Sequence, residues 1–434
     1  MATTTQTAEA GTSRPPPAER AAAALDAALS RLSSSPRPRP IWLDCDPGHD
    51  DAMAILLACH LPQHCRLVGV STVACNQSLE KVTRNALDVL SAVGCGGGRV
   101  PVVAGAARPL VRPGLPPGCP EIHGDSGLDG PEGGPLLPHC GDAPLMDDEA
   151  QRPAVAVMHA AIARAAAAEV EAEAAAETGG DGRAPRPPGA PPSARPRAAP
   201  RVALVCTGAL TNAALLLSVY PQVAGVVEVF VMGGATTGVG NTSPCAEFNI
   251  QTDPEALAVL LRAAEPAPTG GAAPGPSAPH PPLRLTLVPL EVTHTALVTP
   301  GVLRRLGCGG GGGGGGGGDG PPATPFRRML GDLLTFFAGS YKRTFAFDHP
   351  PLHDPCAVLA AVAPSLFDAR RERCEVVTAC PLTAGQTVLD RWRQLGRPEN
   401  VTVAHAMDVE AFWEVVAGAV ERADAASPLN KQGT

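Results

Sequence analysis

The densest group of chemically reactive side chains in this sequence is the run Asp44-Cys45-Asp46-Pro47-Gly48-His49-Asp50-Asp51-Ala52. Four of these nine residues are carboxylates. The apolar residues before the run indicate a buried strand, and those after it indicate a helix. The Pro-Gly pair predicts a tight turn that folds Asp50 and Asp51 back toward Asp46. The run therefore predicts a cluster of acidic oxygens where a strand ends and a helix begins.

Two interpretations of this cluster differ in what offsets its charge. Asp50 and Asp51 are well explained as residues that cap a helix and suit its dipole. That interpretation leaves Asp44 and Asp46 at the end of an apolar strand, where clustered anions without a partner cost free energy. A bound cation removes this cost, and oxygen ligands without a Cys or His cluster favour a hard ion, Ca²⁺ or Mg²⁺. We therefore expect a metal site here.

The acidic run resembles the signature of the nucleoside hydrolase family, the inosine–uridine-preferring enzymes. Later segments agree with the family in order, and the resemblance covers essentially the whole chain outside its low-complexity stretches. Any one segment is weak evidence, but all of them in order are specific. These segments are 73–78 (VACNQS), 122–130 (IHGDSGLDG), 207–212 (TGALTN), 232–235 (MGGA), 240–244 (GNTSP), 246–249 (AEFN) and 353–355 (HDP).

The resemblance implies an enzyme that hydrolyses the N-glycosidic bond of ribonucleosides with one tightly held Ca²⁺. It assigns the ion to the carboxylates of Asp46, Asp51 and Asp354 and to the carbonyl of Thr207. Asp46 is also implied as the general base for a calcium-bound water. Met232 is expected beneath the ribose, whose hydroxyls and hydroxymethyl are expected to contact Asp50, Asn76, Asn241, Glu247 and Asn249.

The base-binding side is less determined by the residues. His123 and His353 stand where the family contacts the base, and both are catalytic candidates for protonating it. Tyr341 and Phe345 either pack a helix or form a stacking wall for the base. A His-containing pocket suits pyrimidines and an aromatic wall suits purines. We therefore expect activity on uridine first, together with inosine or xanthosine.

The residue types fit this chemistry. Glycoside cleavage passes through a sugar with oxocarbenium character, so a dry and anionic ribose site stabilises the developing positive charge. A hard cation orients water, lowers its pKa and chelates diol oxygens. The expected products are ribose and free base.

Two other functions remain open at this point. A haloacid-dehalogenase-like phosphatase also carries Asp-x-Asp after its first strand and uses Mg²⁺, although Pro47-Gly48 and the Asp50-Asp51 pair are unlike that family. A non-catalytic nucleoside-binding protein with the hydrolase fold would lack one of the reactive residues, and none is replaced here.

The reactive residues need a scaffold that brings distant segments together. Short β-branched runs alternate with helical stretches such as 50–61 and 79–93. This pattern predicts an α/β fold with an open, mostly parallel, Rossmann-like sheet and helices on both faces. In such sheets, ligands bind beyond the carboxyl ends of the strands. The predicted strands are 41–43, 67–73, 100–104, 201–206, 226–232 and 283–289.

A single catalytic domain is expected over residues 40–424, after a disordered extension (1–39) and before a C-terminal tail (425–434). Low-complexity insertions are expected near 166–200, 264–282 and 308–325, the last with ten consecutive glycines. Polyglycine has high backbone entropy and no side chain to bury, so it is not a core element.

Composition argues against several other classes of protein. The formal net charge is -8 at pH 7 and no patch of Lys and Arg appears, so we expect no nucleic-acid partner. No apolar run approaches the length of a membrane span, and no membrane partner is expected. Thirteen cysteines are scattered without a CxxC pair, as in reduced intracellular proteins. We expect a cytoplasmic protein, with organellar targeting by residues 1–39 left open, and the resemblance implies a homodimer or homotetramer.

Overall fold

The computed structural model describes most of the chain, including every residue expected in the active site. Several stretches of low sequence complexity lie outside the described residues, among them 179–200, 267–279 and 310–322. No helix within the described part has the length and apolar character needed to cross a membrane. The described residues are 25–26, 29–30, 37–113, 118–139, 152–178, 202–266, 280–309 and 323–431.

One eight-stranded sheet, in the order β3-β2-β1-β4-β5-β6-β10-β7, organises the molecule. Every neighbouring pair is parallel except β10 and β7, so the mostly parallel sheet that was predicted is confirmed. The six predicted strands agree with β1 to β6 within two residues at each end. The strands are β1 (Arg39–Cys45), β2 (Cys65–Thr72), β3 (Val102–Ala104), β4 (Val202–Cys206), β5 (Val227–Met232), β6 (Arg284–Val288), β7 (Phe367–Glu372) and β10 (Val401–Met407).

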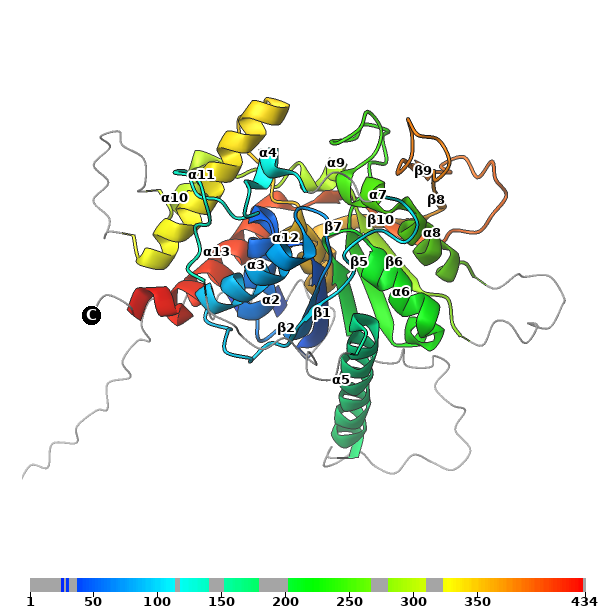
Figure 1. The fold of residues 1–434 in the computed structure, drawn as a ribbon. Coiled ribbons are helices and arrows are strands. Elements are labelled where there is room, and N and C mark those ends of the chain that lie inside the picture. The colour runs from blue at the N-terminus through cyan, green and yellow to red at the C-terminus, as the bar shows by residue number, and fades with distance from the viewer. Residues whose placement is uncertain are drawn as a thin grey trace, which may run out of the picture.

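Helices cover both faces of the sheet, because the strands are apolar on both sides. In β1, Ile41 and Leu43 pack into one core and Trp42 into the other. Figure 1 shows α2, α3, α12 and α13 grouped on one side of the sheet and α5, α6 and α8 on the other. The helices of the first core are α2 (His49–His60), α3 (Leu79–Ala92), α11 (Pro325–Phe345), α12 (Asp354–Val362) and α13 (Val409–Ala426), and those of the second are α5 (Ala154–Thr178), α6 (Thr211–Val219) and α8 (Pro254–Ala263).

The strand order reverses between β1 and β4. The chain builds β2 and β3 on one side of β1 and then returns to place β4 on its other side. Such a reversal opens a crevice at the carboxyl ends of the two central strands, where ligands bind in open α/β sheets. Short helices follow the strands near this edge: α4 (Pro120–His123), α7 (Phe248–Thr252), α9 (Leu290–Thr293) and α10 (Pro300–Arg305).

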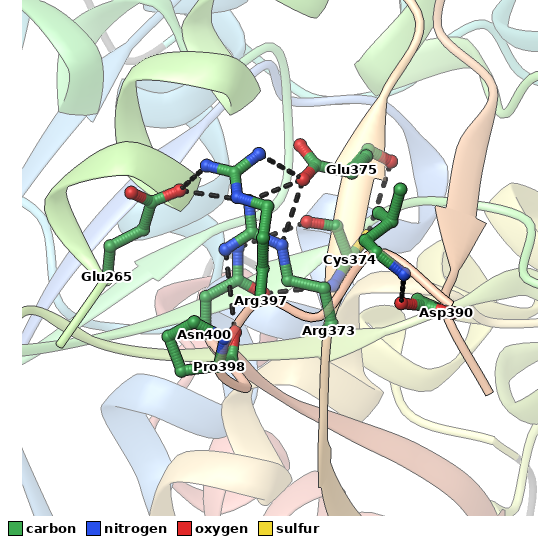
Figure 2. A network of polar contacts seen from close by, with 9 residues as sticks. Glu265, Arg373, Cys374, Glu375, Asp390, Arg397, Pro398 and Asn400 are labelled. Carbon is green, nitrogen blue, oxygen red and sulfur yellow. Dashed lines mark hydrogen bonds and ion pairs between the residues drawn. The ribbon is translucent and has the colours of Figure 1, made fainter. Parts of the chain in front are cut away.

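A two-stranded sheet of β8 (Cys374–Val376) and β9 (Thr387–Leu389) is attached by an ion-pair network (Figure 2). Arg373 is only 3% exposed and contacts Glu265, just beyond α8, at 2.9 Å. Arg397 contacts the same glutamate at 2.5 Å, and both guanidinium groups contact Glu375. Asn400 exchanges two hydrogen bonds with the backbone of β8. These contacts fix the small sheet and its loops against the main body.

The ordered part of the chain extends into segments that were predicted to be irregular. Helix α5 continues to Thr178, so the first part of the 166–200 segment is helical. Helix α13 runs to Ala426, and the Ser427 hydroxyl donates to the Ala92 carbonyl at 2.7 Å, so the 425–434 segment begins as packed structure. Leu25 and Leu29 of the 1–39 extension lie in the first core.

Candidate active site at the strand ends

A cavity of about 560 Å³ lies beyond the carboxyl ends of the central strands. This is within the usual size range of small-molecule sites. Segments from β2, β5, α4, α7, α11 and α12 meet there, although they are far apart in the sequence. Asp46 and Asp51 are fully buried and are not among its lining residues. The other predicted site residues all line it: Asp50, Asn76, His123, Thr207, Met232, Asn241, Glu247, Asn249, Tyr341, Phe345, His353 and Asp354.

Three carboxylates from two helix N-termini converge in this site. Oxygen atoms of Asp50, Asp51 and Asp354 lie within 4.8 Å of one another. Asp50 and Asp51 lie in the first turn of α2, and Asp354 is the first residue of α12 and is followed by Pro355. Burial, followed by the charge of Asp51, raises the pKa of Asp50 to about 7. Burial also raises the pKa of Asp354, and the charge of Asp50 raises it further.

Asp46 lies beside this cluster but is not one of the three residues whose oxygens are all within 4.8 Å of one another. Its Oδ2 accepts a hydrogen bond from the Asn76 backbone at 2.8 Å. Its Oδ1 is buried and has no hydrogen-bond partner. Gly208 makes room for this atom, since a Cβ there would come within 2.4 Å of it. Burial and the charge of Asp51 raise the pKa of Asp46 well above its usual value.

These features fit a hard cation. Among the described residues that line the cavity there is no Lys or Arg to neutralise the carboxylates. The donors are oxygens only, and one of them, Asp46 Oδ1, lacks a partner although it is buried. Buried anions of this kind are paired or coordinate metals in folded proteins. Ca²⁺ and Mg²⁺ are the ions that oxygen-only donor sets favour.

Asp44 is a different case from the other three residues of the acidic run. Its carboxylate accepts hydrogen bonds from Ser71 at 2.5 Å and Asn212 at 2.8 Å. Both bonds reach Oδ1, so side chains from β2 and α6 offset part of the charge of Asp44, whereas its buried Oδ2 has no hydrogen-bond partner. Burial raises the pKa of Asp44 to about 7, and this residue joins three elements of the fold.

The polar residues expected at the ribose are held by the backbone around them. Glu247 is the N-cap of α7 and accepts hydrogen bonds from the backbone of Asn249, Ile250 and Gly234. Burial raises the pKa of Glu247 to about 6. The Asn249 amide donates to the carbonyl of Thr207 at 2.7 Å. These bonds fix the side chains in place before any ligand arrives.

On the opposite wall, His353 is held between two hydroxyl groups. Its Nδ1 lies 2.7 Å from Thr293 Oγ1, and its Nε2 lies 2.8 Å from Tyr341 Oη. The Thr293 hydroxyl also lies 3.4 Å from the Leu290 carbonyl. The tautomer of the His353 ring decides which partner donates in each of the two short bonds. Tyr341 is therefore more than a packing residue, and Thr293 was not predicted.

His49 is a second residue that the sequence did not mark as functional. Its backbone N–H donates to Nδ1 of His123 at 3.3 Å, and its Nε2 donates to the Asp129 carbonyl at 3.0 Å. Its ring stacks against His123, Phe336 and Phe337 with centroids 5.1–5.5 Å apart. Nδ1 of His49 lies 3.2 Å from Nδ1 of His123, and the tautomers of the two rings decide which of these atoms carries a proton. In the sequence, the sign that His49 has a role was its position next to Asp50 in the acidic run.

Comparison with known proteins identifies the family. A family model described as inosine-uridine preferring nucleoside hydrolase matches residues 41–414. The chain is 35% identical over 382 residues to a probable ribonucleoside hydrolase of Dictyostelium discoideum, covering 88% of this chain and 94% of that protein. It is 32% identical over 379 residues to the pyrimidine-specific ribonucleoside hydrolase RihA of Shewanella sp. (strain ANA-3), with 87% and 95% covered. The chain belongs to the nucleoside hydrolase family.

Solved structures agree on the fold of this nucleoside hydrolase. A purine-preferring ribonucleoside hydrolase from Gardnerella vaginalis superimposes with a TM-score of 0.64 at 24% identity, covering 88% of this chain and 99% of that one. A plant nucleoside hydrolase, the PpNRh1 enzyme, gives 0.63 at 23% identity with the same coverage. The predicted fold is confirmed. The family match also confirms an enzyme that hydrolyses ribonucleosides to ribose and free base, in place of the phosphatase and the non-catalytic alternatives.

We expect His49→Phe to keep the ring stack but to lose the side-chain anchor that holds His49 against Asp129. His123 should then be held less well at the base. Loss of an orienting partner typically costs about 10-fold to 100-fold, and we expect that loss in kcat/KM on a natural ribonucleoside. A nitrophenyl riboside has a leaving group that needs no proton, so its rate should stay within about threefold of the original.

The matched control is His159→Phe, since His159 also stacks on an aromatic ring, that of Tyr220, away from the cavity. This control should leave both rates unchanged. An equal fall on both substrates in His49→Phe would show that His49 supports the fold or the ribose site rather than the base side.

Proposed function

We propose that this nucleoside hydrolase holds one Ca²⁺ through the carboxylates of Asp46, Asp51 and Asp354 and the carbonyl of Thr207. The observation that carries this proposal is the buried acidic cluster, in which Asp46 Oδ1 has no hydrogen-bond partner and no Lys or Arg of the described lining approaches. Bound there, the ion would orient a water molecule and the ribose diol and would lower the pKa of the water.

Asp46 is proposed as the general base. Its Oδ2 accepts a hydrogen bond from the backbone N–H of Asn76, whereas Oδ1 has no hydrogen-bond partner and would accept the proton of the attacking water. The water oxygen then forms a bond to the anomeric carbon as the bond to the base breaks. Asp50, Glu247 and Asn249 would grip the ribose, and their negative and dipolar groups stabilise the positive charge that develops on the ring.

The electron pair of the broken bond leaves with the base, which needs a proton or a hydrogen bond. We propose that Nε2–H of His123 and the Tyr341 hydroxyl face the base. His353 would act through Tyr341: with its proton on Nε2 it donates to the phenol oxygen 2.8 Å away, and the phenol hydrogen is then available to the base. Phe345 lines the same wall and offers an apolar face to the ring of the base.

The preferred substrate is proposed to be uridine, followed by inosine or xanthosine. The hydrogen-bonding groups of His123 and Tyr341 suit a pyrimidine, and several relatives at 31–32% identity are named pyrimidine-specific. The test is kcat/KM for uridine, cytidine, inosine, xanthosine, adenosine and 2′-deoxyuridine, with ribose and phosphate measured separately. Strong discrimination against 2′-deoxyuridine is expected, because a missing hydroxyl leaves buried polar groups unpaired. A strict adenosine preference, or equal rates on uridine and 2′-deoxyuridine, would contradict this proposal.

We expect Asp46→Asn to fold normally and to lose about 10³-fold in kcat, since removal of a general base typically costs about 10² to 10⁴. Single-turnover rates would measure the chemical step directly. Asp44→Asn is the matched control, because Asp44 is equally buried at the same strand end but is held by Ser71 and Asn212. Near-normal turnover in a folded Asp46→Asn enzyme would remove Asp46 from the mechanism.

The metal proposal is tested by composition as well as by activity. Elemental analysis of the purified enzyme should find about one Ca²⁺ per chain, as expected for a site of several carboxylates and a carbonyl. Asp354→Asn should lower that ratio, whereas Asp424→Asn should not, because Asp424 pairs with Arg327 away from the cavity. Active enzyme with zinc in place of calcium would overturn the assignment.

Two further aspects of the protein are proposals as well. A homodimer or homotetramer is proposed from the family resemblance, and light scattering of the purified chain measures it. A cytoplasmic location is supported by the cysteines, since all twelve within the described residues are unpaired.

A further inference from the structure

Cys119 is a buried residue of the active-site cavity to which the proposed mechanism assigns no role. It is the N-cap of α4, the short helix that ends at His123. Its carbonyl accepts hydrogen bonds from the backbone N–H groups of Ile122 at 3.0 Å and His123 at 3.1 Å. Its thiol contacts Asn76, in the loop that follows β2. Cys119 therefore joins the helix that carries His123 to a residue expected at the ribose.

Two hydrogen bonds connect Cys119 to Asn76. The backbone N–H of Cys119 donates to the Asn76 carbonyl at 2.9 Å, and the thiol donates to Oδ1 of the Asn76 side chain at 3.4 Å. Gly118 permits this close approach, because its φ is 75° and a Cβ there would clash with the Asn76 carbonyl oxygen. Burial, followed by the charge of Asp46, raises the pKa of Cys119, so the thiol keeps the proton that it donates.

The nitrogen end of the Asn76 amide is held as well. Nδ2 donates to the backbone carbonyl of Asp46 at 3.1 Å and to Oδ2 of Asp51 at 3.4 Å. The reversed amide would place its oxygen against these two acceptors and would turn its N–H groups toward the thiol proton. The contacts therefore fix the orientation of the amide, with Nδ2 toward the acidic cluster and Oδ1 toward the thiol.

This orientation determines what Asn76 can offer to a ligand. Both hydrogens of Nδ2 have acceptors, whereas Oδ1 has two lone pairs and the thiol uses one of them. The second lone pair can accept from a ribose hydroxyl, which would then be the donor. Asn249 has a similar arrangement, because its Nδ2 donates to the carbonyls of Thr207 and Met232 and Cys75 Sγ lies 3.6 Å from its Oδ1.

We propose that Cys119 is a positioning residue for the hydrolysis, whose thiol fixes the Asn76 amide so that Oδ1 accepts a hydrogen bond from a ribose hydroxyl. This inference rests on the proposed function and on the expected contact between Asn76 and the ribose. Cys119 acts through Asn76 and takes no part in bond breaking. Without the thiol proton, the amide loses its restraint on the Oδ1 side and keeps the bonds of Nδ2, so a moderate loss of activity is expected.

The test compares Cys119→Ala with Cys119→Ser, because the two replacements are similar in size and only serine keeps a hydrogen-bond donor. On uridine, Cys119→Ala should lower kcat/KM by about 3-fold to 10-fold, the usual effect of losing one neutral hydrogen bond. Cys119→Ser should recover most of that loss. When Cys119→Ala is added to Asn76→Ala, it should change kcat/KM by less than about twofold, because the group that it positions is already absent.

The sugar gives a second readout that a purely structural role would not produce. Rates are compared on uridine, 2′-deoxyuridine and 3′-deoxyuridine. Cys119→Ala should lower the rate on uridine and leave it unchanged on the deoxynucleoside that lacks the hydroxyl bound by Asn76.

The outcomes separate the role of Cys119 from the role of Asn76. Equal falls on all three substrates, or additive losses in the double variant, would overturn the positioning role of Cys119 even where Asn76→Ala itself is impaired. Full activity of Asn76→Ala would instead remove Asn76 from the ribose site and overturn both assignments.

Cys65→Ala is the matched control. Cys65 is also buried and its thiol donates to the Ala58 carbonyl at 3.6 Å, but it is the first residue of β2, at the end of that strand away from the cavity. This variant should leave the rates on all three substrates unchanged. Circular dichroism and thermal melting of each variant separate a lost contact from a lost fold.

Discussion

Mutual repulsion among Asp46, Asp50, Asp51 and Asp354 is the interaction on which the rest of the active site depends. Burial makes it strong, because little water remains to screen the charges. The fold offsets part of it by placing the N-termini of α2 and α12 at the cluster, where the helix dipoles are positive. The backbone N–H of Gly48 donates to Asp51 at 3.0 Å, and that of Asn76 donates to Asp46. These groups offset only part of the negative charge, and the charge that remains favours a bound cation.

The same constraint explains why the strand order matters. Asp46 follows β1 and Thr207 follows β4, the two strands between which the topology reverses. The hydroxyl of Thr207 donates to Asp51 at 2.8 Å, and its backbone N–H donates to the Asp44 carbonyl. The crevice is thus held by hydrogen bonds across the reversal point itself. Asp44 contributes to that support, and its contacts to β2 and α6 keep the first strand in register with the loops that carry the site.

Local pattern in the sequence was sufficient to predict the parallel sheet and its first six strands, whereas the candidate site residues were assigned from the family resemblance. The N-cap of α8 also follows a local pattern, since Asp253 precedes Pro254 and accepts a hydrogen bond from the backbone of Ala256. The sequence did not reveal the partners of Asp44, the bond from Thr293 to His353, or the small sheet of β8 and β9. Each of these depends on contacts between residues far apart in the chain, and no local periodicity reports such contacts. His49 was overlooked for the same reason, because its ring partners lie in α4 and α11.

The residues proposed for the ribose and those proposed for the base come from different parts of the molecule. Asn249 donates to the carbonyls of Thr207 and Met232, and Glu247 accepts from the backbone of Gly234, so the residues proposed for the ribose are tied to the ends of β4 and β5. His123 and Tyr341, which are proposed to contact the base, come from α4 and α11. Helix α11 also contributes buried side chains, among them Phe326, Leu330 and Phe337, to the first core. The hydrogen-bonded series from Thr293 through His353 to Tyr341 joins α9, the N-cap of α12 and α11, and so ties the wall that carries Tyr341 to the acidic cluster, because Asp354 directly follows His353.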